Sequence, residues 1–92
     1  MIDANALQNE IVGRLEIDNG VLSVPDAVLL DLGRRIAAAA DSDKQDFATA
    51  LIATATRLKQ MPSSRRATTQ VVSLAAIALG DADLNAVLSK AL

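Results

Sequence analysis

The sequence lacks the side chains on which most enzymes depend: it contains no cysteine, histidine, tyrosine or tryptophan, and Phe47 is its only aromatic residue. Without cysteine the chain can form no disulfide, no zinc–thiolate site and no thiol nucleophile. Without histidine it lacks the commonest general acid or base, and neither a Ser–His nor a Cys–His nucleophile pair can be built. The sequence therefore predicts that the protein is not an enzyme and uses no metal or cofactor.

Clustered glycines, long apolar runs and targeting patterns are also missing. The four glycines stand at positions 13, 20, 33 and 80, so the chain has none of the glycine-rich loops that hold phosphates. No apolar run reaches the roughly 18–20 residues that cross a bilayer. The first residues lack the basic and then apolar pattern of a secretory signal. We therefore expect a cytoplasmic protein with no membrane partner.

The acidic residues near the middle of the chain do not follow a known metal-binding pattern. Counted from Asp41, a calcium loop of the EF-hand type needs a ligand at its fifth position, Gly at its sixth and Glu at its twelfth. Those positions hold Gln45, Asp46 and Ile52. Acids at the start of a helix are favoured by the helix dipole, which explains them without a metal.

Small apolar residues dominate what is present. Apolar residues make up 51% of the 92 residues, and nearly all of them are Ala, Leu, Ile or Val. A chain of this length corresponds to one domain, so residues 1–92 are predicted to form a single helical domain. Domains this small fold with little margin. Part of the stability could therefore come from a partner or from self-association, and a stable monomer is the alternative.

Apolar residues at helical spacing, separated by turn signals, predict a compact bundle of four to five short helices. Asp3 is expected to cap the first helix and Gly13 to end it in a left-handed turn. Ser42 with Gln45 resembles a capping box, and Gly33 is expected to mark the close approach of another backbone. The predicted helices span about residues 4–12, 25–40, 43–60, 64–79 and, from Asp81 or Asp83, to Ala91.

Two of these helices have distinctive apolar faces. Residues 71–79 are apolar nearly all round, which is typical of a central, buried helix. The last predicted helix carries an inward stripe of Leu84, Val87, Leu88 and Leu92.

A β-hairpin is predicted at about residues 15–24, near the N-terminus of the bundle. Asn19-Gly20 suits the positive φ angles of a two-residue type I′ turn, and alternating apolar residues flank it. The alternative is a longer first helix that ends at Gly20. An isolated hairpin is marginal in water, so this one must pack on the helices or pair with a strand of another chain.

The turn fixes the expected register of the hairpin. Ile17 should lie opposite Leu22, and Leu15 opposite Val24, with all four side chains on one face of the hairpin.

Charge is divided unevenly along the chain. Residues 1–46 hold nine acids and four bases, for a charge of −5, whereas residues 47–92 hold two acids and five bases, for +3. Such polarity favours oriented association with a partner or with a second copy. Chance segregation on a solvated surface is the alternative.

A basic cluster without an intervening acid brackets the predicted turn at residues 61–64. Two of its arginines fall at a helix start, where the helix dipole disfavours cations. Serine side chains and free amides there could hold an anion, and the helix–turn–helix order loosely resembles DNA-reading modules. The candidate partner-binding residues are Arg57, Lys59, Ser63, Ser64, Arg65 and Arg66.

One segment resembles a known family. Residues 20–25, Gly-Val-Leu-Ser-Val-Pro, followed by Val28, Leu32 and Gly33, look like the signature of AbrB/MazE-type swapped-hairpin DNA-binding domains. The resemblance implies DNA binding and further strands after the helix. The chain carries Val21 and Leu29 where that family commonly has arginine.

Together these features predict a small intracellular interaction protein, such as an inhibitor, adaptor or small subunit, that binds another protein or protein complex. A nucleic-acid binder that uses residues 57–66 is one alternative. A self-assembling structural subunit, and hence a homo-oligomer, is the other.

Overall fold

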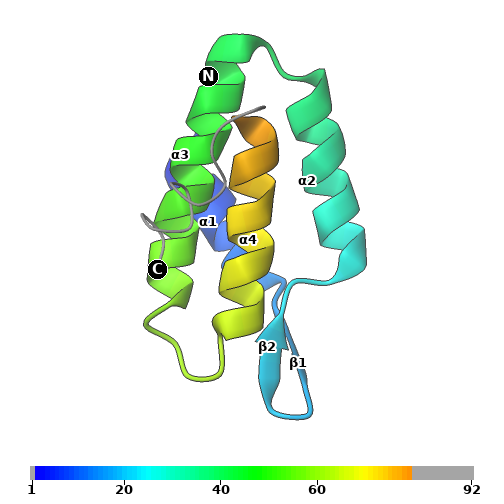
Figure 1. The fold of residues 1–92 in the computed structure, drawn as a ribbon, viewed down its shortest axis with the longest axis vertical. Coiled ribbons are helices and arrows are strands. Elements are labelled where there is room, and N and C mark those ends of the chain that lie inside the picture. The colour runs from blue at the N-terminus through cyan, green and yellow to red at the C-terminus, as the bar shows by residue number, and fades with distance from the viewer. Residues whose placement is uncertain (1, 80–92) are drawn as a thin grey trace.

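Four helices and one antiparallel hairpin make up the fold in the computed structural model, which describes residues 2–79 (Figure 1). The predicted mostly helical bundle with an N-terminal hairpin is confirmed. The predicted last helix, from Asp81 or Asp83, lies outside the described residues. The elements are α1 (Ala4–Gly13), β1 (Glu16–Asp18), β2 (Val21–Ser23), α2 (Asp26–Ala38), α3 (Asp41–Leu58) and α4 (Arg65–Ala78).

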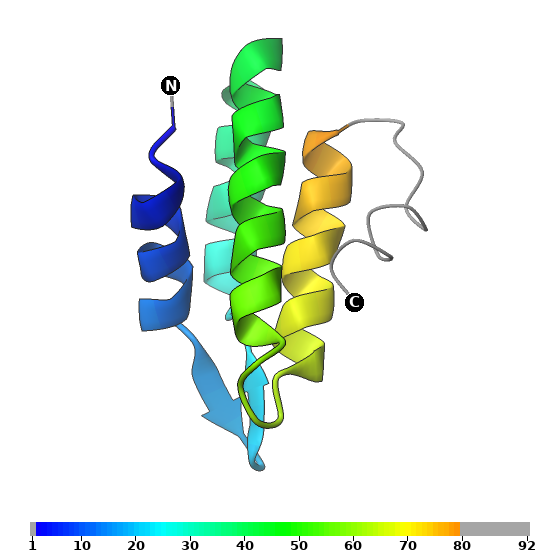
Figure 2. The ribbon, with the colours of Figure 1, turned by 90° about the vertical axis from the view of Figure 1, so that its left-hand side faces the viewer.

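The core is built on the antiparallel pair α3 and α4, with α1 packed on α3 and α2 packed on α4 (Figures 1 and 2). Alanines let the two central helices approach closely. The hydroxyls of two buried threonines donate hydrogen bonds to backbone carbonyls four residues earlier in the chain. Thr54 donates to the carbonyl of Ala50 at 2.7 Å and Thr68 to that of Ser64 at 2.9 Å. The fully buried apolar residues of the pair are Ala50, Leu51, Ala55, Leu58, Ala67, Val71, Val72 and Ala75.

Helix α1 begins as predicted but ends differently. The Asp3 carboxylate accepts a hydrogen bond from the Ala6 amide at 3.1 Å, and Leu7 and Ile11 are buried. Gly13 was expected to end the helix in a left-handed turn, and this is wrong. It is the last helical residue, and its φ is not positive. The C-cap of the helix is Arg14, whose amide donates to the carbonyl of Ile11.

The hairpin has the predicted turn and register. Asn19 and Gly20 have φ of 53° and 79°, as a type I′ turn requires. Ile17 pairs with Leu22, and the strands are antiparallel. The alternative of a longer first helix is therefore excluded.

Helix α4 covers the outer edge of β2. Backbone groups of alternate residues in such a hairpin point away from the partner strand. The Leu22 amide donates to the Ser63 carbonyl at 3.0 Å. The Gln70 side chain accepts from the Val24 amide at 2.8 Å and donates to the Val24 carbonyl at 3.2 Å. Gln70 thus supplies the hydrogen bonds that a third strand would make.

The apolar face of the hairpin is only partly covered. Val24 is buried and Leu15 and Leu22 are half-buried, whereas Ile17 is 72% exposed. The hairpin extends past the ends of the helices (Figure 2), which explains why its tip lacks cover.

Two predictions about α2 and α3 are wrong. Among residues 2–79, a Cβ added at Gly33 would meet nothing within 4 Å, so no other described backbone closely approaches this glycine. The Ser42–Gln45 capping box is absent because α3 begins at Asp41, which places Ser42 inside the helix. Acids in that first turn favour the helix electrostatically instead.

Arg35 ties α2 to α1 at the surface. Its guanidinium donates to both Glu10 carboxylate oxygens, at 2.9 and 2.7 Å, and to Asp31 at 2.6 Å. The hydrogen bond from Arg35 lowers the pKa of Glu10 from its ordinary value. The two helices share few other contacts, so this pair is their main polar link.

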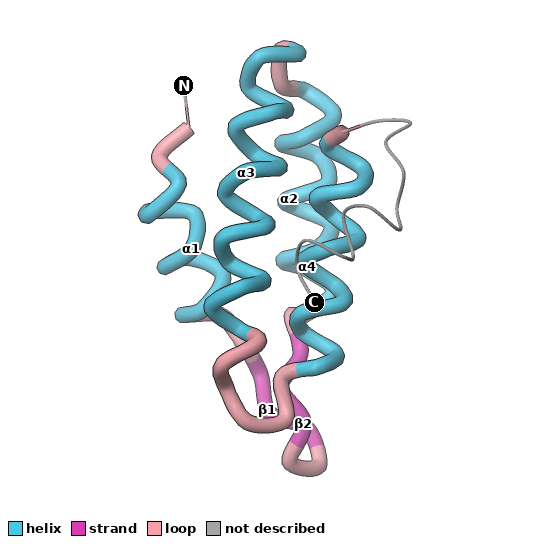
Figure 3. Tube along the Cα trace, turned by 60° about the vertical axis from the view of Figure 1, so that its left-hand side comes forward, coloured by secondary structure: helices cyan, strands magenta, loops and turns pink. Residues whose placement is uncertain are grey.

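After α2 the described chain continues only with helices, α3 and α4 (Figure 3). Within residues 2–79, therefore, the further strands implied by the resemblance to AbrB/MazE-type domains are absent. None of the helices in this range is both long enough and apolar enough to span a membrane.

Candidate docking surfaces

The predicted basic turn, residues 57–66, links α3 to α4 beside the hairpin (Figure 1). The turn is held by Ser64, which is 5% exposed and whose hydroxyl donates to the carbonyls of Leu58 and, at 2.7 Å, Met61. Ser63 has a φ of 56° and its carbonyl accepts from Leu22. The Ser64 hydroxyl therefore stabilises the turn itself, and the Ser63 carbonyl links the turn to strand β2.

The basic side chains of this turn have different surroundings. Arg57 donates to the Asn9 side chain of α1 at 3.1 Å, and Lys59 is exposed. Arg65 and Arg66 are exposed in the first turn of α4. Neither forms an ion pair with any residue in 2–79. The structure thus brings the predicted residues to one end of the molecule, where Arg65 and Arg66 are exposed.

The two helices joined by the basic turn lie side by side and antiparallel (Figures 1 and 2). DNA-reading helix–turn–helix units instead cross at about 90–120°, so that one helix can enter the major groove. The α3–α4 unit is therefore a helical hairpin, and the DNA-binding hypothesis depends on the arginines alone.

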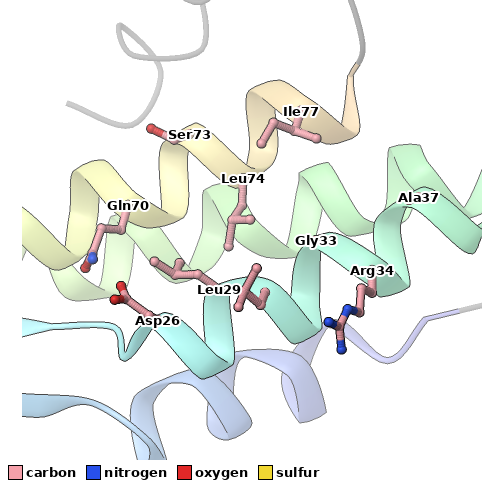
Figure 4. Close-up of a pocket in the computed structure, with 10 residues that line it drawn as sticks. Asp26, Leu29, Gly33, Arg34, Ala37, Gln70, Ser73, Leu74 and Ile77 are labelled. Carbon is pink, nitrogen blue, oxygen red and sulfur yellow. The ribbon is translucent and has the colours of Figure 1, made fainter.

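A second surface, which sequence reasoning missed, is an apolar groove between α2 and α4, here called the α2–α4 groove. Its volume is about 740 Å³. Leu74 points from α4 toward α2, and Gln70 and Ile77 mark its two ends on α4 (Figure 4). Leu30 and Ile77 on its rim are each 61% exposed. The groove is lined by Asp26, Leu29, Leu30, Gly33, Arg34, Ala37, Gln70, Ser73, Leu74 and Ile77.

The groove exists because α2 uses only one of its apolar stripes to pack on the bundle. Val28, Leu32 and Ile36 are buried at four-residue spacing. Leu29 lies beside that stripe and lines the groove, whereas Leu30 lies on the outer face of α2 and stands on the rim of the groove. Gly33 and Ala37 also line the groove, and these small residues leave space between α2 and α4.

One sequence signal could have revealed this surface. The apolar stretch 71–79 is typical of a central, buried helix, yet Ile77 and Leu79 are exposed. Its apolar stripe is thus wider than the described neighbouring elements cover, and exposed apolar surface of this kind is a candidate for an interaction site.

The groove offers apolar contact and little polar chemistry. Small-molecule sites normally add a few convergent polar groups that orient the ligand. Gln70 is already engaged by Val24, and no buried side-chain polar atom in residues 2–79 lacks a partner. In the same range no cluster of acidic, histidine or cysteine side chains is arranged to hold a metal ion.

Comparison of this chain with protein-family models, with curated proteins and with solved structures found no match.

Proposed function

We propose that this protein is a non-catalytic interaction protein, an inhibitor, adaptor or small subunit, that binds another protein through the α2–α4 groove. The observation that supports this proposal is the exposure of Leu30 and Ile77 on the rim of an apolar groove. Contiguous exposed apolar surface on a small domain marks an interaction site more often than a chance feature.

The energetic argument rests on buried area. Covering a Leu or Ile that is 61% exposed contributes roughly 1–2 kcal/mol by its apolar area. The half-buried Leu29 beside them adds to this amount. An amphipathic helix fits such a site, because helix-in-groove recognition inserts apolar side chains between two helices of the host.

The test compares a groove variant with a matched control of equal charge change. Leu30→Asp places a charge on the groove, whereas Thr56→Asp places it on an exposed position of α3. A partner captured from native lysate is purified, and its affinity for each form is measured by calorimetry. We expect Leu30→Asp to weaken binding at least about tenfold by lost apolar burial and desolvation of the charge. Equal affinity of the two variants would overturn the proposal.

Arg65 and Arg66, which form no ion pair with residues 2–79, favour a second candidate function, nucleic-acid binding by the basic turn. Phosphate contacts would give an affinity that falls steeply with salt. A titration of the intact protein with DNA and RNA at low salt, repeated with Arg65→Glu/Arg66→Glu, tests this candidate. Binding that the double variant abolishes would support it, and no binding at low salt would end it.

A cytoplasmic location is part of the proposal. Fractionation of native cells with an antibody to the protein tests it, and recovery in a membrane or secreted fraction would contradict it.

A further inference from the structure

Three exposed residues on the outer face of α2 form a symmetric pattern. Asp26, Leu30 and Arg34 follow one another at four-residue steps, so they lie on one face of the helix. Leu30 stands midway between a negative and a positive side chain. The same face forms one wall of the α2–α4 groove.

Both charged residues are without partners in the described part of the chain. Neither Asp26 nor Arg34 takes part in an ion pair or a side-chain hydrogen bond with residues 2–79. The adjacent Arg35, in contrast, binds two carboxylates. Among the described residues, therefore, nothing neutralises the charges that flank Leu30.

We propose that the occupant of the α2–α4 groove is a second copy of this chain, bound with the two α2 helices antiparallel about a two-fold axis at Leu30. In this arrangement Asp26 of each copy faces Arg34 of the other, so both pairs are of opposite charge. An isologous interface requires a patch that complements itself in this way. The inference rests on the proposed function, because it names the protein that binds the groove.

The smaller residues of α2 allow the two backbones to approach. Ala27 and Gly33 lie three residues on either side of Leu30 and face each other across the same axis. A Cβ at Gly33 would meet no atom of the described part of its own chain within 4 Å. The two Leu30 side chains can then pack against each other at the axis, on the rim of the groove. A partner helix without opposite charges eight residues apart would pair with only one of the two residues, Asp26 or Arg34.

A charge-swap cycle measured by sedimentation equilibrium tests the pairing. Asp26→Lys and Arg34→Glu alone each turn both attractive pairs into repulsive ones. We expect each single variant to weaken dimerisation about tenfold or more. The double variant restores opposite charges and should recover most of the affinity. Arg65→Glu, which changes charge on another surface, should leave dimerisation unchanged.

The rescue separates pairing from helix stability. Asp26 lies in the first turn of α2, where an acid also favours the helix dipole. Arg34→Glu cannot repair that local effect, so recovery in the double variant identifies the contact. A double variant as weak as Asp26→Lys would overturn the proposed pairing.

A cysteine placed at the axis gives an independent test, because the native chain contains no cysteine. Leu30→Cys should form a disulfide-linked dimer under mild oxidation, since the two sulfurs meet at the axis. Thr56→Cys on α3 serves as the control and should cross-link far more slowly. Equal rates would overturn the proposal.

Monomeric wild-type protein up to about millimolar concentration, far above a specific affinity, would also overturn it. The groove would then have another occupant, either another protein or residues 80–92 of the same chain. Binding of a different protein that Leu30→Asp weakens would still support the proposed function. The two failures are therefore distinguishable.

Discussion

The two sides of α4 differ sharply. The side packed into the bundle, chiefly against α3, is closed, and Val71, Val72 and Ala75 of α4 have no exposed surface. The side that faces α2 is open, so that Leu74 forms the floor of a groove and Ile77 stands 61% exposed on its rim. One helix thus contributes both to the core and to an exposed apolar groove. The comparison indicates that apolar character alone does not decide which residues are core.

The difference follows from the two helices that pack against α4. Helix α3 has 18 residues and α2 has 13. The longer helix presents alanines that allow close packing along the full length of α4. Helix α2 turns its buried stripe toward the core and leaves Leu29 and Leu30 beside α4. We therefore expect substitutions on the closed side to lower the free energy of unfolding far more than substitutions on the open side.

The largest effect is expected on the closed side. Leu51→Ala removes a side chain with no exposed surface and should lower the free energy of unfolding by about 2–5 kcal/mol, through lost burial and the cavity left behind. Urea denaturation followed by circular dichroism measures this loss. A loss below about 1 kcal/mol, the range of surface sites, would mean that Leu51 does not belong to the core.

A smaller effect is expected where α4 holds the hairpin. Gln70→Leu keeps a side chain of similar size but leaves the Val24 amide and carbonyl without their partner. The free energy of unfolding should fall by about 1–3 kcal/mol. Gln60→Leu, at an exposed turn position, is the control and should be nearly neutral. If both changes have the same effect, the hairpin does not depend on Gln70.

Gly33→Ala should stabilise the monomer. The position is helical and has room for a methyl group, so the change should raise the free energy of unfolding by up to about 1 kcal/mol. Gly20→Ala is the contrasting change, because φ of 79° strains any other residue. Thermal melts at low protein concentration compare the two. A destabilised Gly33→Ala would show that α2 has a close neighbour on its open side.

The smallest expected effect concerns pH. The pKa of Glu10 is lowered in the folded state by Arg35, so the unfolded chain binds the proton more tightly. The pair therefore contributes stability above the ordinary pKa of 4.5 and loses it as the pH falls through the lower folded value. Because both side chains are partly exposed, the contribution should stay below about 1 kcal/mol. Unfolding measured from pH 6 to 3 should show this loss in the native chain and not in Glu10→Gln.

The sequence was sufficient to predict most of the fold because the decisive signals are local. The Asn19-Gly20 turn, the Asp3 cap and the stripe of Val28, Leu32 and Ile36 each follow from residues close together in the chain. Such signals depend on backbone conformation or helical period, which neighbouring residues largely determine.

The remainder depended on contacts between distant residues. Gln70 on α4 is hydrogen-bonded to the backbone of Val24, 46 positions away in the chain. No local sequence pattern predicts this contact. The apolar stretch 71–79 indicated excess apolar surface, but its sequence could not show that Ile77 is the exposed residue, because this depends on how far α2 lies from α4. The sequence correctly placed the candidate residues of the basic turn close together. It could not show that Ser64 is buried rather than exposed.

The most direct test of the open docking face compares two leucines of α2 that stand two positions apart. Leu32 is 1% exposed and Leu30 is 61% exposed. Urea unfolding of Leu32→Ala and Leu30→Ala is measured at a protein concentration at which the wild type is monomeric. We expect a loss of about 2–5 kcal/mol for Leu32→Ala and of no more than about 0.5 kcal/mol for Leu30→Ala. Equal losses in the monomer would show that Leu30 belongs to the core of the chain, and this would contradict the account.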